Sequence, residues 1–212
     1  MNVVGSPDQW RNVINSLVPD ILELVITTWR EMPALAGDAL EDPTTEELCR
    51  RLRQNRNTAE LPFRIDIQMV ELDPQAGQNQ GRIDITFSPT LPREDIYFAL
   101  ECKRLNVVGP RGVRSLATEY VTQGMLRFVR GQYAASVRHG GMLGYVLDGR
   151  LVFAISKVNQ AVKARREELN MVPPGGLAPS SIRTADPHAK QSGHLRQQRQ
   201  DFTIHHLFVA SP

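Results

Sequence analysis

The sequence is poor in the residues that mark several large classes of protein. It has two cysteines, Cys49 and Cys102, which lie far apart and follow no pattern. This spacing excludes a disulfide framework and a cysteine-rich zinc site, and it favours a reducing compartment, so we expect a cytoplasmic protein. No zinc-finger spacing, phosphate-cradling glycine-rich loop or nucleophile elbow is present.

Long hydrophobic runs and a strong charge imbalance are also missing. The apolar stretch Leu17 to Trp29 contains Asp20 and Glu23, so it is too short and too charged to span a bilayer. The start of the chain has no basic segment followed by an apolar one, and we expect neither a secretory signal nor a membrane partner. The formal net charge of +2 does not by itself indicate nucleic-acid binding, although arginines cluster locally.

The 212 residues, of which 41% are hydrophobic, suit one domain with a sizeable core. Periodicity predicts an α/β fold with a central mixed sheet flanked by helices. An N-terminal helical segment at 1–43 precedes a domain at 44–212 with a C-terminal elaboration. The expected helices are 7–30 (one helix, or two broken at Pro19), 44–57 (capped by Thr44), 115–138 and 158–169. The expected strands are 63–70, 142–147, 151–155, 202–210 and two more around Asp84 and Glu101. Loops are expected at 105–114 and, flexible, at 170–200.

The most informative feature is a pair of apolar strands that carry charged residues. Asp84 lies in Gly81-Arg82-Ile83-Asp84-Ile85, and the next strand ends in Phe98-Ala99-Leu100-Glu101-Cys102-Lys103. Because alternate side chains of a strand share a face, Glu101 and Lys103 point the same way. Two carboxylates from adjacent strands, with the backbone carbonyl of Cys102, can bind Mg²⁺, while Lys103 orients or activates an attacking water.

Two other interpretations of these strands stay open. A Glu-x-Lys pair occurs by chance on many solvated strand edges. Asp66, on the wet face of the preceding strand, is a rival for the first metal ligand.

The motif resembles that of the PD-(D/E)xK nuclease superfamily, which has the restriction-endonuclease-like fold. Asp84, Glu101 and Lys103 match its three motif positions, with Ile83 where many members have proline, and the similarity covers about Thr44 to Leu147. The resemblance implies a DNA endonuclease that uses Mg²⁺ or Mn²⁺. Some members add an acidic residue from the preceding helix, and Glu46 or Glu47 can fill that place. Others place Gln and Tyr on the following helix, where Gln123 or the pair Gln132-Tyr133 can match.

Candidate DNA contacts follow the motif. Glu119, Gln123, Arg127 and Arg130 recur at helical spacing, and Arg196 lies in the basic part of the later loop. The arginines can grip phosphates, or the stripe can simply be a solvated helix face. The five histidines, His139, His188, His194, His205 and His206, are weaker binding candidates, since consecutive His205 and His206 face opposite sides of a strand.

We therefore expect a metal-dependent nuclease, for which the nuclease subunit of a bacterial or phage DNA-defence system is a natural setting by analogy. It should act as a homodimer or with a targeting partner protein, through a contact near Trp10, Leu17 and Trp29. Two alternatives remain: a catalytically inactive nucleic-acid-binding or scaffold subunit of the same fold, and an RNA-cleaving toxin effector.

Overall fold

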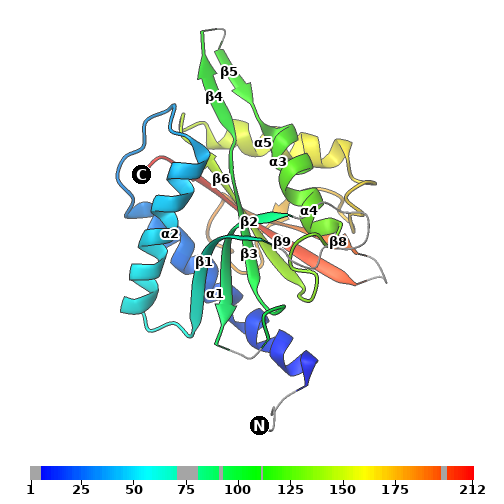
Figure 1. Ribbon diagram of the computed structural model, residues 1–212. Coiled ribbons are helices and arrows are strands. Elements are labelled where there is room, and N and C mark those ends of the chain that lie inside the picture. The colour runs from blue at the N-terminus through cyan, green and yellow to red at the C-terminus, as the bar shows by residue number, and fades with distance from the viewer. Residues whose placement is uncertain (1–5, 71–80, 91–92, 111, 197–199) are drawn as a thin grey trace.

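The computed structural model describes residues 6–70, 81–90, 93–110, 112–196 and 200–212 as an α/β protein with a seven-stranded mixed sheet (Figure 1). The helices are α1 (Pro7–Arg30), α2 (Glu41–Thr58), α3 (Ala117–Tyr120), the π-helical turn η1 (Val121–Met125), α4 (Leu126–Val129) and α5 (Leu151–Ala164). The strands are β1 (Phe63–Val70), β2 (Arg82–Pro89), β3 (Phe98–Arg104), β4 (Asn106–Gly109), β5 (Gly112–Ser115), β6 (His139–Val146), β7 (Ala178–Pro179), β8 (Ala189–Leu195) and β9 (Asp201–Ala210).

The sheet has the strand order β1-β2-β3-β6-β9-β8-β7. β1, β2 and β3 form an antiparallel meander, and β3, β6 and β9 run parallel to one another. The parallel strands lie in the middle of the sheet, and β6 is buried over nearly its whole length. This agrees with its apolar sequence, because parallel strands are covered on both faces.

Helices cover both faces of the sheet. On one face Trp29 of α1 stacks on Tyr145 of β6 with ring centroids 4.8 Å apart. On the other face Gly124 of η1 lies so close to β6 that a Cβ there would clash with Met142. Residues 142 and 145 point to opposite faces of their strand. The motif side chains on β3 share the face of Met142, under the helical segment 117–129.

The N-terminal helix α1 is part of the core. Ser6 caps it, Pro19 is accommodated inside it, and Ile21, Leu22 and Val25 are fully buried. Trp29 is only 3% exposed, and its indole nitrogen donates to the carbonyl of Ala210 at 2.6 Å. Trp29 is therefore covered by the chain's own sheet rather than available to a second chain, whereas Trp10 and Leu17 pack partly buried against the core.

Helix α2 begins earlier than the sequence pattern predicts. It starts at Glu41 after Leu40, so the predicted cap at Thr44 is wrong; the Thr44 hydroxyl instead donates to the carbonyl of Leu40 within the helix. Pro43 falls in the first turn, where a missing N–H costs nothing. The earlier start brings Glu41 into the first turn of the helix, next to the motif strands.

The region after the motif also differs from the prediction. The helix expected at 115–138 ends at Val129, where Gly131 with φ of +70° follows. Residues 151–155 belong to helix α5 rather than to a strand, since Ala154, Val158 and Val162 bury one helical face. The predicted loop at 105–114 forms the β4-β5 hairpin, and the one at 170–200, of which 197–199 lie outside the described residues, contains β7 and β8.

Among the helices in the described part of the chain, none is long and apolar enough to cross a membrane.

Candidate active site

The structure brings Asp84, Glu101 and Lys103 together at the end of β3. Ile85 lies opposite Leu100 in the β2-β3 register, which puts Asp84 beside Glu101 on the opposite face of the two strands. The Asp84 carboxylate accepts a hydrogen bond from the backbone N–H of Cys102 at 2.7 Å. This bond fixes the carboxylate next to the strand that carries the other two motif residues.

Lys103 is the centre of the cluster. Its Nζ lies 3.0 Å from Glu101 Oε1 and 3.9 Å from Asp84 Oδ2. It also donates to the carbonyl oxygen of Cys102 at 3.0 Å and to Glu41 Oε1 at 2.9 Å. A cation thus sits among the same hard oxygen atoms that the sequence suggested as ligands of a metal.

Glu101 is the most perturbed carboxylate of the group. Its side chain is fully buried, and burial, followed by the charge of Asp84, raises its pKa to about 7 even though Lys103 and Arg127 oppose the shift. Its Oε1 faces both cations, whereas Oε2 is buried with no hydrogen-bond partner. An unpartnered buried carboxylate oxygen is costly, and it is an open ligand position.

The other two motif groups carry opposite charges in a partly dry site. Burial raises the pKa of Asp84, with Lys103 and the Cys102 N–H acting against it. Burial pulls the pKa of Lys103 down, but Glu101, Asp84 and Glu41 together raise it above its ordinary value. Lys103 therefore stays an ammonium at neutral pH, and it acts through charge and hydrogen-bond donation rather than as a base.

Glu41 is a site residue that the sequence analysis missed. Its Oε1 accepts from Lys103 and its Oε2 accepts from the backbone N–H of Arg104 at 2.8 Å. The available signal was the acidic pair Glu41-Asp42 just before Pro43, because acidic residues and proline are both common in the first turn of a helix. Placing the helix start at Thr44 hid that signal.

Neither of the helix carboxylates expected near the metal reaches the cluster. Glu47 pairs with Arg50 and with Arg51, the latter at 2.7 Å, and Glu46 is exposed on α2. Glu46 and Glu47 lie more than one helical turn after Glu41, and of these three carboxylates it is Glu41, at the N-terminal end of α2, that accepts from Lys103 and Arg104 of β3.

Arg127 is the one predicted phosphate contact that joins the triad. Its guanidinium donates to Glu101 Oε1 at 3.1 Å and to the Tyr133 hydroxyl at 2.8 Å, and its side chain is still 36% exposed. Tyr133 in turn donates to the carbonyl of Arg82 at 2.6 Å, which ties the arginine to β2. An exposed, oriented guanidinium beside two carboxylates can receive a phosphate oxygen.

Of the other predicted nucleic-acid contacts, Arg130 and Arg196 have partners outside the cluster. Arg130 is paired with Glu168 at 2.8 Å, and Gln123 is exposed on η1. Arg196 is buried: its guanidinium stacks on Phe202 at 3.3 Å and donates to backbone carbonyls of Tyr133 and Ala134, and burial lowers its pKa to about 9. Arg196 therefore holds the turn after α4 and is not free to grip a phosphate.

Asp66 and the histidines also stay outside the cluster. Asp66 lies opposite Thr86 on the edge strand β1, near Arg53 at 3.8 Å. His206 and His194 are buried in a chain of hydrogen bonds that runs from Tyr120 through His206 and Ser192 to His194 and the carbonyl of Leu169. Burial lowers the pKa of His194 to about 4, so these rings are neutral core groups.

The oxygen atoms of the cluster determine whether it can hold a divalent cation. Within the residues that the structure describes, no three His, Cys, Asp or Glu side chains gather as a metal-binding group. Asp84, Glu101 with its free Oε2, and the Cys102 carbonyl offer hard oxygens from two side chains and one backbone group. This suits Mg²⁺, which is held by one or two carboxylates and takes its remaining ligands from water and substrate phosphate.

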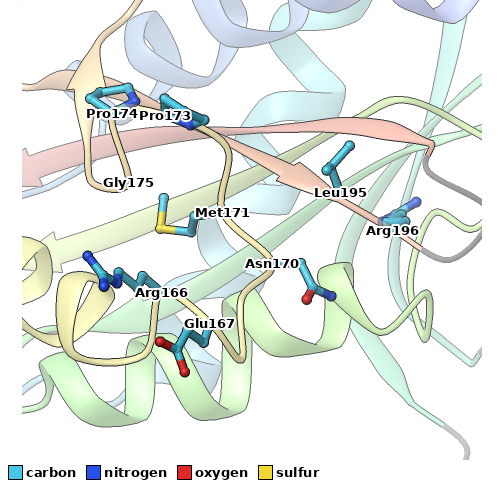
Figure 2. A pocket seen from close by; sticks show the side chains of 9 residues that line it. All are labelled: Arg166, Glu167, Asn170, Met171, Pro173, Pro174, Gly175, Leu195 and Arg196. Atoms are coloured by element: carbon cyan, nitrogen blue, oxygen red, sulfur yellow. The ribbon is translucent and has the colours of Figure 1, made fainter.

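A concave pocket of about 720 Å³ lies away from the triad (Figure 2). Its lining residues come from the end of the α5 region and from β8: Arg166, Glu167, Asn170, Met171, Pro173, Pro174, Gly175, Leu195 and Arg196. None of the triad residues lines it, and Arg196 directs its guanidinium to backbone carbonyls. The cluster around Lys103, rather than this pocket, therefore holds the groups with reactive chemistry.

Comparison with known proteins leaves the family open. No protein-family model, curated protein or solved structure matches the chain. The case for function rests on the arrangement of the residues themselves.

Proposed function

We propose that the protein is a metal-dependent nuclease that hydrolyses phosphodiester bonds in DNA. The observation that carries the proposal is the convergence of Asp84, Glu101 and Lys103 on one point, with Lys103 Nζ 3.0 Å from Glu101 and 3.9 Å from Asp84. The succession α2, β1-β2-β3, a helical segment and a parallel β6 also agrees with the core expected for the PD-(D/E)xK superfamily.

The acidic and basic side chains of the cluster have different roles. Asp84, Glu101 and the Cys102 carbonyl would hold Mg²⁺ or Mn²⁺, which when bound supplies a Lewis acid for the phosphodiester and lowers the pKa of water. Lys103, which stays protonated at neutral pH, orients the attacking water and stabilises the negative charge that develops on the phosphate. Arg127 binds a non-bridging phosphate oxygen, and Glu41 keeps Lys103 in place.

A binding or scaffold subunit without catalysis is the second candidate, and one observation favours it. Lys103 faces the carboxyl groups of Glu101, Asp84 and Glu41, and Arg127 adds a second positive charge beside Glu101, so two cations oppose three carboxyl groups. The cluster is thus close to charge balance without a metal, as in a structural ion-pair network.

A cleavage assay decides between the two. Purified protein is incubated with plasmid, linear duplex DNA, single-stranded DNA and RNA, each with Mg²⁺, Mn²⁺ or EDTA, beside a Lys103→Ala protein. Cutting of DNA with metal, absent in EDTA and in the variant, supports the nuclease. Binding without cutting under all conditions supports the second candidate, and cutting of RNA alone would make the substrate assignment wrong.

A further inference from the structure

The β4-β5 hairpin is a second feature of the active-site end of the sheet. β3, the strand of Glu101 and Lys103, leads through Leu105 directly into β4, and the hairpin projects beyond the sheet at the top of Figure 1. It forms a separate two-stranded sheet, and among the described residues no other strand pairs with it. An isolated two-stranded ribbon is at best marginally stable in water, so a hairpin that projects from the sheet in this way suggests a functional role.

The base of the hairpin is firmly attached. Leu105 is buried, its N–H donates to the carbonyl of Tyr145 at 2.9 Å, and its carbonyl accepts from Leu116 at 2.7 Å. The Asn106 amide donates to both carboxylate oxygens of Asp148 at 2.9 and 3.1 Å. Whatever the ribbon contacts is therefore held at a fixed position relative to Lys103.

The outer part of the hairpin is exposed and basic. Val108 is 57% exposed, and the Arg114 side chain is 68% exposed with its nearest carboxylate, Glu119, 3.8 Å away. The sequence from 106 to 115 contains two basic residues, Arg111 and Arg114, and no acidic one. This charge complements a polyanion, and the exposed valine is suited to an apolar contact such as a thymine methyl group.

The tip of the hairpin carries glycines, and one of them has no packing reason in the free protein. Gly112 has φ of +104°, a conformation that favours glycine. Gly109 has no such conformation, and a Cβ there would meet only the carbonyl of Gly112 at 3.9 Å, an ordinary contact. A side chain could therefore be accommodated at Gly109 in the free protein. That the residue is nevertheless glycine agrees with a close approach of the backbone to a bound partner.

We infer that the β4-β5 hairpin enters the major groove of duplex DNA next to the scissile phosphate, and that it makes the site selective for double-stranded substrate. The inference rests on the proposed nuclease function. The major groove admits a two-stranded β-ribbon, and four-residue strands reach on the order of 10 Å from their base, enough to reach base edges. Arg114 contacts phosphate or a base edge, and the thin Gly109 end passes between the backbones.

The test uses full-length protein with Ca²⁺ in place of Mg²⁺, so that binding is measured without cutting. Three variants are compared with wild type: replacement of residues 107–114 by Asn-Gly, which keeps the Asn106–Ser115 pair; Gly109→Val; and Arg114→Ala. Arg64→Ala, an exposed arginine on the edge strand β1, is the matched control. Binding to fluorescent duplex and single-stranded oligonucleotides is titrated, and cleavage is then followed in Mg²⁺.

We expect the shortened hairpin to lose at least tenfold in affinity for duplex DNA, with little change in affinity for single strands. Gly109→Val and Arg114→Ala should also weaken duplex binding, whereas Arg64→Ala should keep the wild-type affinity. If wild type cuts DNA and all hairpin variants bind duplex as tightly as it does, the inference is wrong and the nuclease proposal stands. Equal losses for duplex and single strands would also overturn it. If wild type neither binds nor cuts any nucleic acid, the proposed function fails first.

Discussion

The ammonium of Lys103 lies 3.0 Å from the buried carboxylate of Glu101, within a strand that turns Phe98, Leu100 and Cys102 to the other face. This contact places one permanent cation against one carboxylate whose pKa is about 7. A metal held through Glu101 Oε2 would balance part of the charge of that carboxylate, and Lys103, still held by Glu41, would then be able to donate to the substrate.

Lys103→Ala should reduce cleavage by about 10²–10³-fold, the loss typical of removing one donor that stabilises transition-state charge. Metal binding should persist, since both carboxylates remain. Lys103→Arg should also be impaired, because a planar guanidinium cannot reproduce a point-like ammonium between Glu101 and Glu41. Single-turnover cleavage measures the effect, with the exposed Lys163 changed to Ala as control. Wild-type rates in Lys103→Ala would remove this residue from the mechanism.

Asp84→Asn and Glu101→Gln should each slow cleavage by about a thousandfold or more, since each removes a charged ligand of the proposed metal. Circular dichroism should show an intact fold in both. Asp66→Asn is the informative control, because Asp66 lies on the edge strand near Arg53 and should be dispensable. Loss of activity in Asp66→Asn with retention in Asp84→Asn would reverse the assignment.

Metal binding should release a proton near neutral pH. In the metal-free protein burial raises the pKa of Glu101 to about 7, so below that pH a metal must displace a proton from it. Apparent Mn²⁺ affinity should therefore fall by up to about tenfold per pH unit below 7 and level off above it. Calorimetry at pH 6.5 in two buffers of different ionisation enthalpy counts the proton, and Glu101→Gln should abolish the difference. Affinity that is constant from pH 6 to 8 would contradict the assignment.

The same carboxyl group affects folding in the absence of metal. Its folded pKa lies above its ordinary value of 4.5, so its contribution to stability is complete below that pH and is lost as the pH rises through 7. His194 works in the opposite sense: burial lowers its pKa to about 4, so stability is lost as the pH falls from about 6.5 toward 4. Comparing wild type with Glu101→Gln by urea unfolding isolates the first contribution.

Glu41 should act by positioning Lys103 rather than by touching the phosphate. Glu41→Ala should lower the cleavage rate by about 10–100-fold, as loss of an orienting partner does. Glu41→Gln should recover part of it, because the one amide oxygen can still accept from Lys103, although the amide NH2 group cannot replace Oε2 as acceptor for the Arg104 N–H. Substrate affinity in Ca²⁺ should not change in either variant. Glu46→Gln and Glu47→Gln serve as controls, and equal losses in these would mean that Glu41 has no special position.

The parts of the fold that follow from local periodicity were predictable. Alternation identified β1, apolar runs identified β2, β3 and β9, and the spacing of Ile21, Leu22 and Val25 identified α1. Residues 151–155 were mistaken for a strand because Asp148-Gly149 is a common hairpin turn, whereas Ala154, Val158 and Val162 need tertiary contacts to be recognised as one helical face. The 170–200 segment is rich in turn-forming residues, and pairing with β9 makes a strand of its second half.

The candidate site was predictable where its residues share two adjacent strands, and not where they come from distant elements. Asp84, Glu101 and Lys103 were identified because strand alternation and hairpin pairing determine their relative positions. Glu41 is 62 positions from Lys103, and only the packing of α2 against β3 joins them. Arg196 was mistaken for a phosphate contact because its sequence neighbours are polar, although tertiary structure buries its guanidinium against Phe202.

Arg127 and Arg130 lie three positions apart on the chain but should behave differently with DNA. Arg127 contacts Glu101 and is partly exposed, whereas Arg130 is paired with Glu168. Arg127→Ala should weaken DNA binding in Ca²⁺ and reduce the slope of log affinity against log salt by about 1, without changing sequence preference. Arg130→Ala should leave both unchanged. Fluorescence anisotropy from 50 to 300 mM salt measures the two slopes side by side, and the same slope for Arg127→Ala as for wild type would show that this guanidinium only neutralises Glu101.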